Sequence, residues 1–304
     1  MFLGLVLGFL TSISWALGNV FIQRSGRAVG GPRALTWALG IGGGLSALAA
    51  VAFDERTAAI DGRSLGWVAL AALSGLSAYA TIFYSFTRAK LSLAVPFITC
   101  WSLVAGIFSM TVLGHSVRGG QLLGAAIVVL GVVLVSISAG RSQDARPEAS
   151  ASHPHGPADA QMPAADGGWR PLVAALISGI SFGIMVPAMG EATPAFGTFG
   201  VASVVYLLGL VLAVPLCLVV GINLSPPPKA AFGVVLGAGI FETLGFVCLN
   251  AAGRFAPMVV VAPVASLAAA LTVLYAAIFL RERPGWLALC GALCASVGVV
   301  VLAF

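Results

Sequence analysis

Residues 1–22 read MFLGLVLGFLTSISWALGNVFI, a stretch that contains no charged side chain. A helix needs about 20 mostly apolar residues to cross the roughly 30 Å hydrocarbon core of a bilayer. Nine further apolar stretches of similar length follow, at 34–53, 64–86, 91–113, 119–139, 171–190, 196–221, 229–250, 257–279 and 285–303. None shows the strict alternation of a β-barrel strand. We therefore expect an all-α integral membrane protein with ten transmembrane helices.

The composition excludes a soluble fold. Of the 304 residues, 60% are hydrophobic and only 8% are charged, and the mean hydropathy is +1.06. A soluble domain carries roughly a quarter of charged residues. The net charge of +5 comes from Lys and Arg scattered between the apolar stretches, where charges that flank membrane helices belong. We expect the lipid bilayer as the partner and no nucleic acid, because no basic face is available to bind it.

One hydrophilic stretch divides the chain. Residues 140–169 are rich in Ala, Pro, Ser, Asp and His and contain no apolar run, which predicts a flexible linker. It separates a first five-helix repeat (1–139) from a second (170–304). The linker holds His153 and His155, but a closed metal site needs about four donors. We expect no metal site and no cofactor.

The two halves are related by an internal repeat. A single shift of 167 positions aligns similar residues at the start and at the end of the half: Ser14-Trp15-Ala16 with Ser181-Phe182-Gly183, Pro96 with Pro263, and Gly131-Val132-Val133 with Gly298-Val299-Val300. Because five spans is an odd number, the second half must enter the membrane in the opposite direction to the first. Inverted repeats recur in secondary transporters, which bind substrate near the membrane midplane at the repeat interface.

The pattern resembles the drug/metabolite transporter superfamily, in particular its EamA-type ten-helix branch. The resemblance covers the whole chain apart from the linker. It rests on the run Ser14 to Asn19, on a proline in each fourth span, on a Gly-x6-Gly-Val helix closing each half, and on the turn Leu280-Arg281-Glu282-Arg283-Pro284. In that turn Arg281 replaces the glycine of the family pattern, and in the first half His115 replaces its glutamate. The resemblance implies an exporter or exchanger of metabolites such as amino acids, nucleobases, sugars or amphiphilic drugs.

Glu242 is an acid in the middle of the eighth apolar stretch. A carboxylate at a helix centre costs about 2.5–3.5 kcal/mol on insertion scales, so such residues usually face a cavity or a partner. One interpretation is a proton-coupling carboxylate or a counter-charge for a cationic substrate. The other is a neutral carboxyl group hydrogen-bonded inside the bundle. Glu191, beside Gly190 and before Pro194, is expected at the membrane interface.

Other polar and aromatic residues in the apolar stretches are candidates for a midplane binding site. Trp15 and Asn19 share one helix face, because they are four residues apart. Thr243 and Asn250 share another. The remaining candidates are Tyr79, Trp101 and Tyr275, and three prolines are expected to kink their helices: Pro96, Pro187 and Pro263.

These observations predict a secondary transporter, an exporter or exchanger of a small metabolite or amphiphilic compound, that works by alternating access. Proton coupling through Glu242 and simple facilitated export are both compatible with the sequence. No Walker-type phosphate loop is present. The alternatives are a membrane receptor or scaffold and a membrane-embedded enzyme. No His lies in an apolar stretch, so we do not expect an enzyme.

The sequence leaves the orientation open. Eleven Lys and Arg lie on the side of the linker and four on the side of both termini, so the positive-inside rule places the termini outside the cytoplasm. The family resemblance implies cytoplasmic termini. We expect a multi-pass protein of the inner or plasma membrane, and the oligomeric state stays open.

Overall fold

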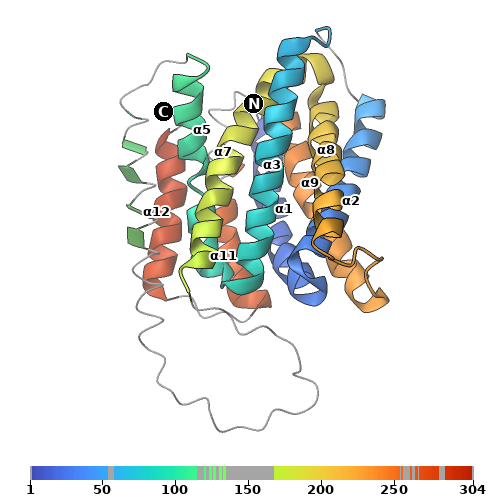
Figure 1. Cartoon of the computed structure of the whole chain (residues 1–304). Coiled ribbons are helices and arrows are strands. Elements are labelled where there is room, and N and C mark those ends of the chain that lie inside the picture. The colour runs from blue at the N-terminus through green and yellow to red at the C-terminus, as the bar shows by residue number, and fades with distance from the viewer. Residues whose placement is uncertain are drawn as a thin grey trace.

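The computed structural model is an all-helical bundle (Figure 1). It describes residues 2–53, 58–114, 168–253, 267–280 and 285–302, together with 255, 261, 264–265 and parts of 120–134. The predicted linker, apart from Gly168 and Trp169, lies outside these residues, as do most of the fifth apolar stretch and part of the ninth.

Seven helices in the described residues are long and apolar enough to cross a membrane. In chain order they are α1 (Phe2–Val29), α2 (Gly31–Phe53), α3 (Gly62–Arg88), α4 (Leu91–Ile98) continued by α5 (Trp101–Thr111), α7 (Arg170–Phe196), α8 (Thr198–Val219) and α9 (Lys229–Gly253). Two shorter apolar helices follow, α11 (Ala268–Phe279) and α12 (Trp286–Leu302). This supports the all-α membrane class.

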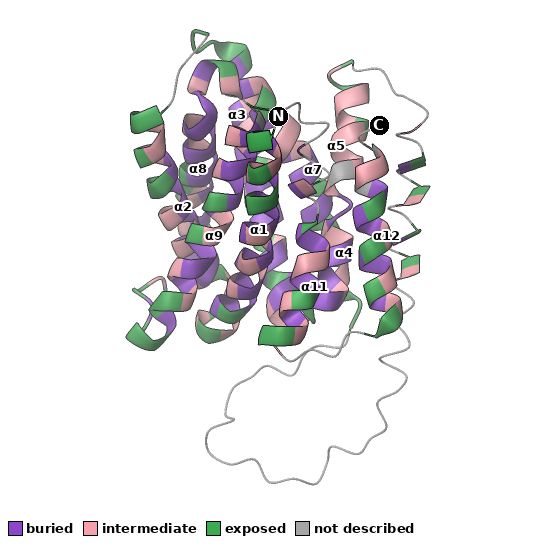
Figure 2. Ribbon diagram, turned by 180° about the vertical axis from the view of Figure 1, so that it is seen from behind, coloured by how far each residue is buried: buried purple, intermediate pink, exposed green. Residues whose placement is uncertain are grey.

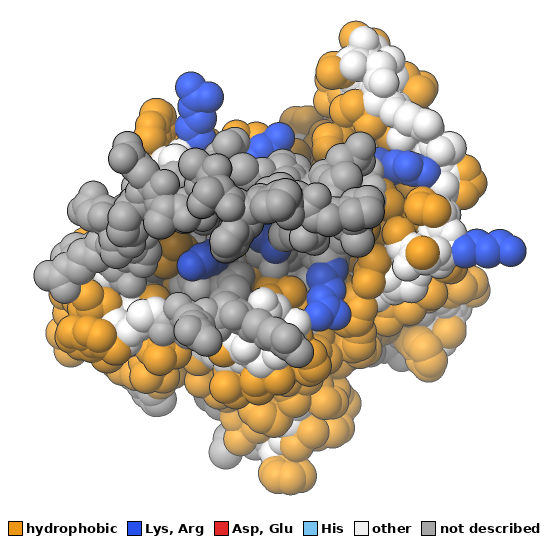
Figure 3. All heavy atoms as spheres, turned by 90° about the horizontal axis from the view of Figure 1, so that it is seen from below, with side chains coloured by type: hydrophobic (Ala, Val, Ile, Leu, Met, Phe, Trp, Pro, Cys, Tyr) orange, Lys and Arg blue, Asp and Glu red, His pale blue; other side chains and the backbone are white. Residues whose placement is uncertain are grey.

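The outer surface of the bundle is apolar, as a lipid-facing surface must be. Large hydrophobic side chains lie exposed along the helices, including Val51 (91%) and Val219 (86%), while buried residues concentrate on the faces that meet in the interior (Figure 2). Basic side chains are scattered over the lower end of the bundle, which is seen from below in Figure 3. Acidic side chains do not show among the described atoms in that view.

The most extensive helix packing joins the two halves of the chain. It pairs α1 with α9, α3 with α7 and α2 with α8. Under the 167-residue shift, α1 corresponds to α7 and α3 to α9, so the first two pairings exchange into one another. α1 begins at the upper end of the view in Figure 1, whereas α7 begins at the lower end. Each half therefore completes its interior with helices of the other.

Glycines allow α1 and α9 to approach closely. A β-carbon on Gly237 would lie 2.5 Å from the ring of Phe21, and one on Gly245 would lie 2.4 Å from the indole of Trp15. Small residues at helix contacts let side chains of the partner helix fill the vacant space, which is how membrane helices gain packing energy.

The fourth span is interrupted where it enters the interior. α4 ends at Ile98, and a turn at Thr99 and Cys100 precedes α5. In this turn the amide of Cys100 bonds the carbonyl of Phe97 at 3.4 Å, three residues back instead of four. Pro96, inside α4, has no amide hydrogen to donate and so contributes no backbone bond toward the previous turn. The interruption lies beside the interior cavity described below.

Candidate functional site

A cavity opens in the interior between α1, α3, α4, α5, α7, α9 and α11. Its free volume is ≈ 80 Å³, several times what a single water molecule needs. Most of its lining is apolar or aromatic, with a few polar groups, as is usual for small-molecule sites. The described residues that line it are Trp15, Asn19, Ile82, Val95, Ile98, Thr99, Trp101, Phe182, Val186, Glu242, Phe246, Ala265, Ala268 and Ala269.

Four pairs of repeat mates line this one cavity. Residues n and n + 167 both belong to the lining for Trp15 and Phe182, Asn19 and Val186, Ile98 and Ala265, and Trp101 and Ala268. A cavity lined by corresponding residues of both halves lies where the halves meet. Three of the four pairs differ in chemistry, since the first half supplies two indoles and an amide where the second supplies Phe, Val and Ala, whereas Ile98 and Ala265 are both aliphatic.

Aromatic rings form one wall of the cavity. The ring of Trp15 meets Phe246 at a centroid distance of 5.2 Å and an angle of 69°, and it meets Trp101 at 6.4 Å and 85°. Edge-to-face contacts of this kind fix rings relative to one another. The Trp15 indole nitrogen is buried and has no hydrogen-bond partner among the described residues. It lies against Gly245, 2.5 Å from where a β-carbon would be.

Glu242 lies near the middle of α9, and its carboxyl group ends a chain of hydrogen bonds between two tyrosine hydroxyl groups. The Tyr79 hydroxyl donates to Oε1 of Glu242 at 3.2 Å and lies 3.0 Å from the Tyr206 hydroxyl. The chain joins α3, α8 and α9, and both tyrosines are buried. The other carboxyl oxygen, Oε2, lies against Gly18 of α1. Glu242 also lines a second, smaller cavity together with Tyr79 and Tyr206, so its side chain stands between the two spaces.

The orientation of Asn19 follows from the hydrogen bonds of Thr272. The Thr272 hydroxyl donates its one proton to the carbonyl of Ala268 at 2.7 Å. It can therefore only accept from Asn19, whose Nδ2 lies 3.0 Å away. This assigns the amide nitrogen to the side of α11 and leaves Oδ1 of Asn19 as an acceptor.

The other predicted site residues lie outside the main cavity lining. Thr243 lines the smaller cavity. Tyr275 packs its ring against Phe279 at 5.7 Å. Asn250 has a buried Nδ2 with no hydrogen-bond partner among the described residues.

The predicted prolines differ in their placement. Pro96 lies inside α4 next to the interruption, and Pro187 lies inside α7, which runs without a break from Arg170 to Phe196. Pro263 lies outside the described residues. Pro96 and Pro187 each directly follow a residue of the cavity lining, Val95 and Val186 respectively.

Sequence reasoning missed Tyr206, Phe182 and Thr272. Phe182 had a signal, because the repeat aligns it with Trp15. Tyr206 aligns with Leu39, so nothing in its own helix distinguished it from a packing residue. Thr272 matters only through Asn19, a residue 253 positions away.

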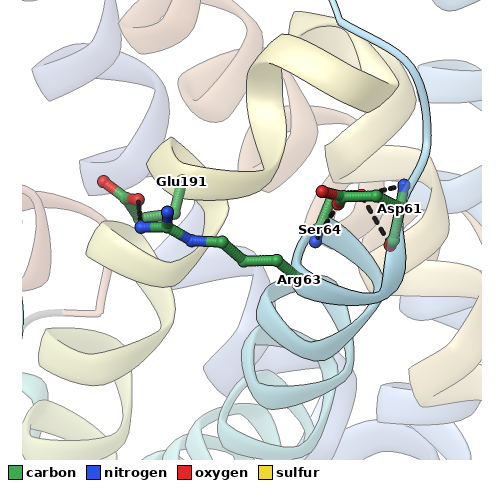
Figure 4. Close-up of polar contacts among 4 residues, drawn as sticks. All are labelled: Asp61, Arg63, Ser64 and Glu191. Atoms are coloured by element: carbon green, nitrogen blue, oxygen red, sulfur yellow. Dashed lines mark hydrogen bonds and ion pairs between the residues drawn. The ribbon is translucent and has the colours of Figure 1, made fainter.

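Outside the cavity, charged side chains at α3 and α7 form an ion pair and a helix cap. Arg63 and Glu191 form an ion pair at 3.6 Å between α3 and α7 (Figure 4), and the Arg63 side chain is 76% exposed. Beside them, Asp61 caps α3 by accepting from the Ser64 amide at 2.7 Å. That bond, followed by the Ser64 hydroxyl, lowers the pKa of the Asp61 carboxyl group. In the described part of the chain, His, Cys, Asp and Glu form no group of three that could hold a metal ion.

Comparisons with known proteins agree with this architecture. The family model of EamA-like transporters matches residues 2–137 and again residues 169–304. No curated protein matches the chain. A crystal structure of a protein is similar over 99% of this chain and 97% of its own, with a TM-score of 0.65 and 17% sequence identity. At that identity the likeness shows the fold alone.

Proposed function

Because the chain belongs to the EamA-like transporter family, we propose that it moves a small metabolite or amphiphilic compound across the membrane as a secondary transporter working by alternating access. A multi-pass membrane protein of the drug/metabolite transporter type follows from the family. The substrate, the direction of transport and the coupling belong to the proposal. We propose export, or exchange, across the inner or plasma membrane.

The observation that carries the proposal is the lining of the main cavity by four pairs of repeat mates. A site between two related halves can be exposed to either side by exchanging the arrangements of the halves. The opposite starting ends of α1 and α7 (Figure 1) and the exchange of the α1–α9 and α3–α7 pairings support the inverted relation of the two halves, which we propose to contain five transmembrane helices each.

The interrupted fourth span supports the same mechanism. Secondary transporters place broken helices at the site, where irregular backbone lines a cavity. Ile98, Thr99 and Trp101 at or next to the turn between α4 and α5 belong to the lining. A movement at this turn changes the cavity directly.

Glu242 is the residue that we propose for substrate binding or proton coupling. A carboxyl group near the centre of a membrane helix is costly unless it has a partner or a use. Here it has one hydroxyl donor and a place between two cavities. Tyr79 donates a hydrogen bond to the Glu242 carboxyl group, and the Tyr206 hydroxyl bonds that of Tyr79.

The test is an untargeted comparison of small molecules inside and outside cells that express the intact chain, the Glu242→Gln variant or an empty vector. We expect one or more metabolites to be displaced across the membrane only with the intact chain. Glu191→Gln is the matched control, because it makes the same chemical change in a surface ion pair and should transport normally. Equal metabolite distributions in all strains, with the protein present in the membrane, would argue against transport.

A further inference from the structure

The charge and the hydrogen-bonding groups of the main cavity lining determine which ligands it can bind. None of the described lining residues is Lys, Arg or His, and one, Glu242, is an acid. Oδ1 of Asn19 is an acceptor, because Nδ2 faces Thr272 and donates one of its two N–H groups to it. The Thr99 hydroxyl donates to the carbonyl of Val95 at 3.0 Å. The described lining also holds two indole N–H donors, that of Trp15, which is buried against Gly245, and that of Trp101.

A cationic ligand complements the one charged side chain among the described lining residues, Glu242. A protonated amine carries up to three N–H donors and one positive charge, which complements a carboxylate and an amide oxygen. A carboxylate or phosphate would meet Glu242 as a like charge and would find no cation among the described lining residues. Like charges held close together in a space of low dielectric repel strongly.

The aromatic wall favours the same ligand. The indoles of Trp15 and Trp101 lie nearly perpendicular to one another, and Phe246 meets Trp15 edge-on. Organic cations bind aromatic faces through the ring quadrupole, and Trp is the best of the aromatic side chains for this. The lining also includes Phe182 and Val186, which suit an apolar body.

We propose, on the basis of the transport function above, that the substrate is a small organic monocation, an amine with an aromatic or aliphatic body and no carboxylate. Its ammonium group binds between Glu242 and Asn19 beside the indoles, and its apolar body lies against Phe182 and Val186. The difference between repeat mates sets this orientation of the ligand, because the polar Asn19 corresponds to the apolar Val186 and the indole of Trp15 to the phenyl ring of Phe182.

Three probes that share a phenyl ring test the proposal by equilibrium binding to the purified full-length chain. Phenethylamine is a cation, L-phenylalanine adds a carboxylate to it, and 3-phenylpropionate carries the carboxylate alone. We expect phenethylamine to bind at least tenfold more tightly than either of the others. Equal affinities, or a preference for a carboxylate-bearing probe, would overturn the proposal.

Variants show whether the preference arises in this cavity. Glu242→Gln should abolish most of the preference for phenethylamine, whereas Glu191→Gln should keep it. Asn19→Val installs the side chain of the repeat mate and should weaken amine binding several-fold without affecting 3-phenylpropionate. If both Glu242→Gln and Asn19→Val keep the full preference for phenethylamine, the assignment of the binding site to this cavity is wrong. Thermal unfolding of each variant shows that it is folded.

Uptake of the same probes into liposomes that contain the protein separates this proposal from the general one. Uptake of L-phenylalanine without uptake of phenethylamine would refute the cation class and leave the transport function standing. Specific binding of phenethylamine without any uptake would refute transport and leave the binding class standing.

Discussion

Gly245 of α9 is the position where a single methyl group should disturb both packing and the cavity. In Gly245→Ala the new β-carbon would lie 2.4 Å from Cδ1 and 2.5 Å from Nε1 of Trp15. Carbon atoms in contact prefer about 3.5–4.0 Å, so the indole must move by about 1 Å. It has little room to do so, because Phe246 and Trp101 pack against its ring. Overpacking of this kind costs about 1–3 kcal/mol.

Gly233→Ala in the same helix is the matched control, because a β-carbon there has no neighbour within 4 Å. Both substitutions gain about 1 kcal/mol of helix propensity on replacing Gly by Ala. The difference between the two variants therefore isolates the contact with Trp15. We expect Gly245→Ala to be less stable than Gly233→Ala by about 1–3 kcal/mol, measured as the free energy of unfolding in SDS-titrated mixed micelles.

The same displacement should reach the site, since Trp15 lines the cavity. Phenethylamine binding should weaken in Gly245→Ala and remain normal in Gly233→Ala. If the two variants unfold with the same free energy and bind the probe equally well, the packing of Trp15 against α9 is not as described, and the aromatic wall argument fails with it.

Two further predictions concern hydrogen bonds of known partners. Tyr206→Phe removes one hydrogen-bond partner of Tyr79 and should cost about 1 kcal/mol of stability. Tyr79→Phe also leaves Glu242 without its hydroxyl donor and should cost more. The free energies of unfolding of the two variants check this order, and the reverse order would contradict the hydrogen bonds from Tyr206 through Tyr79 to Glu242. At pH values above the ordinary pKa of Asp, the ionised Asp61 carboxylate stabilises α3 as its cap. This contribution to stability should be lost as the pH falls through the lowered pKa of Asp61 in the folded state. The Ser64 amide chemical shift should then titrate below pH 3.8 and stay flat in Asp61→Asn; a midpoint at or above that value would contradict the cap.

The predictable part of the site came from charges and repeats. Glu242 was recognisable because a charged side chain in an apolar helix needs a reason, and Trp15, Asn19 and Trp101 line the cavity as candidates of the predicted kind. Tyr275 and Asn250 have similar polarity in similar stretches, yet the structure places them outside the lining. Helical periodicity groups residues of one helix on a face but does not say which face meets the cavity.

The sequence by itself determined that the chain lies in lipid and that it consists of two related halves. Apolar runs long enough to span a bilayer require helices, because a helix satisfies its own backbone hydrogen bonds in lipid, and the common shift of 167 positions required two related halves. The tertiary structure decided the chemistry of the site. Tyr206 reaches Glu242 only through Tyr79 of another helix, and Asn19 presents an oxygen only because Thr272 occupies its nitrogen. Such roles depend on contacts between residues far apart in the chain, and close approach at glycines such as Gly245 sets which residues meet.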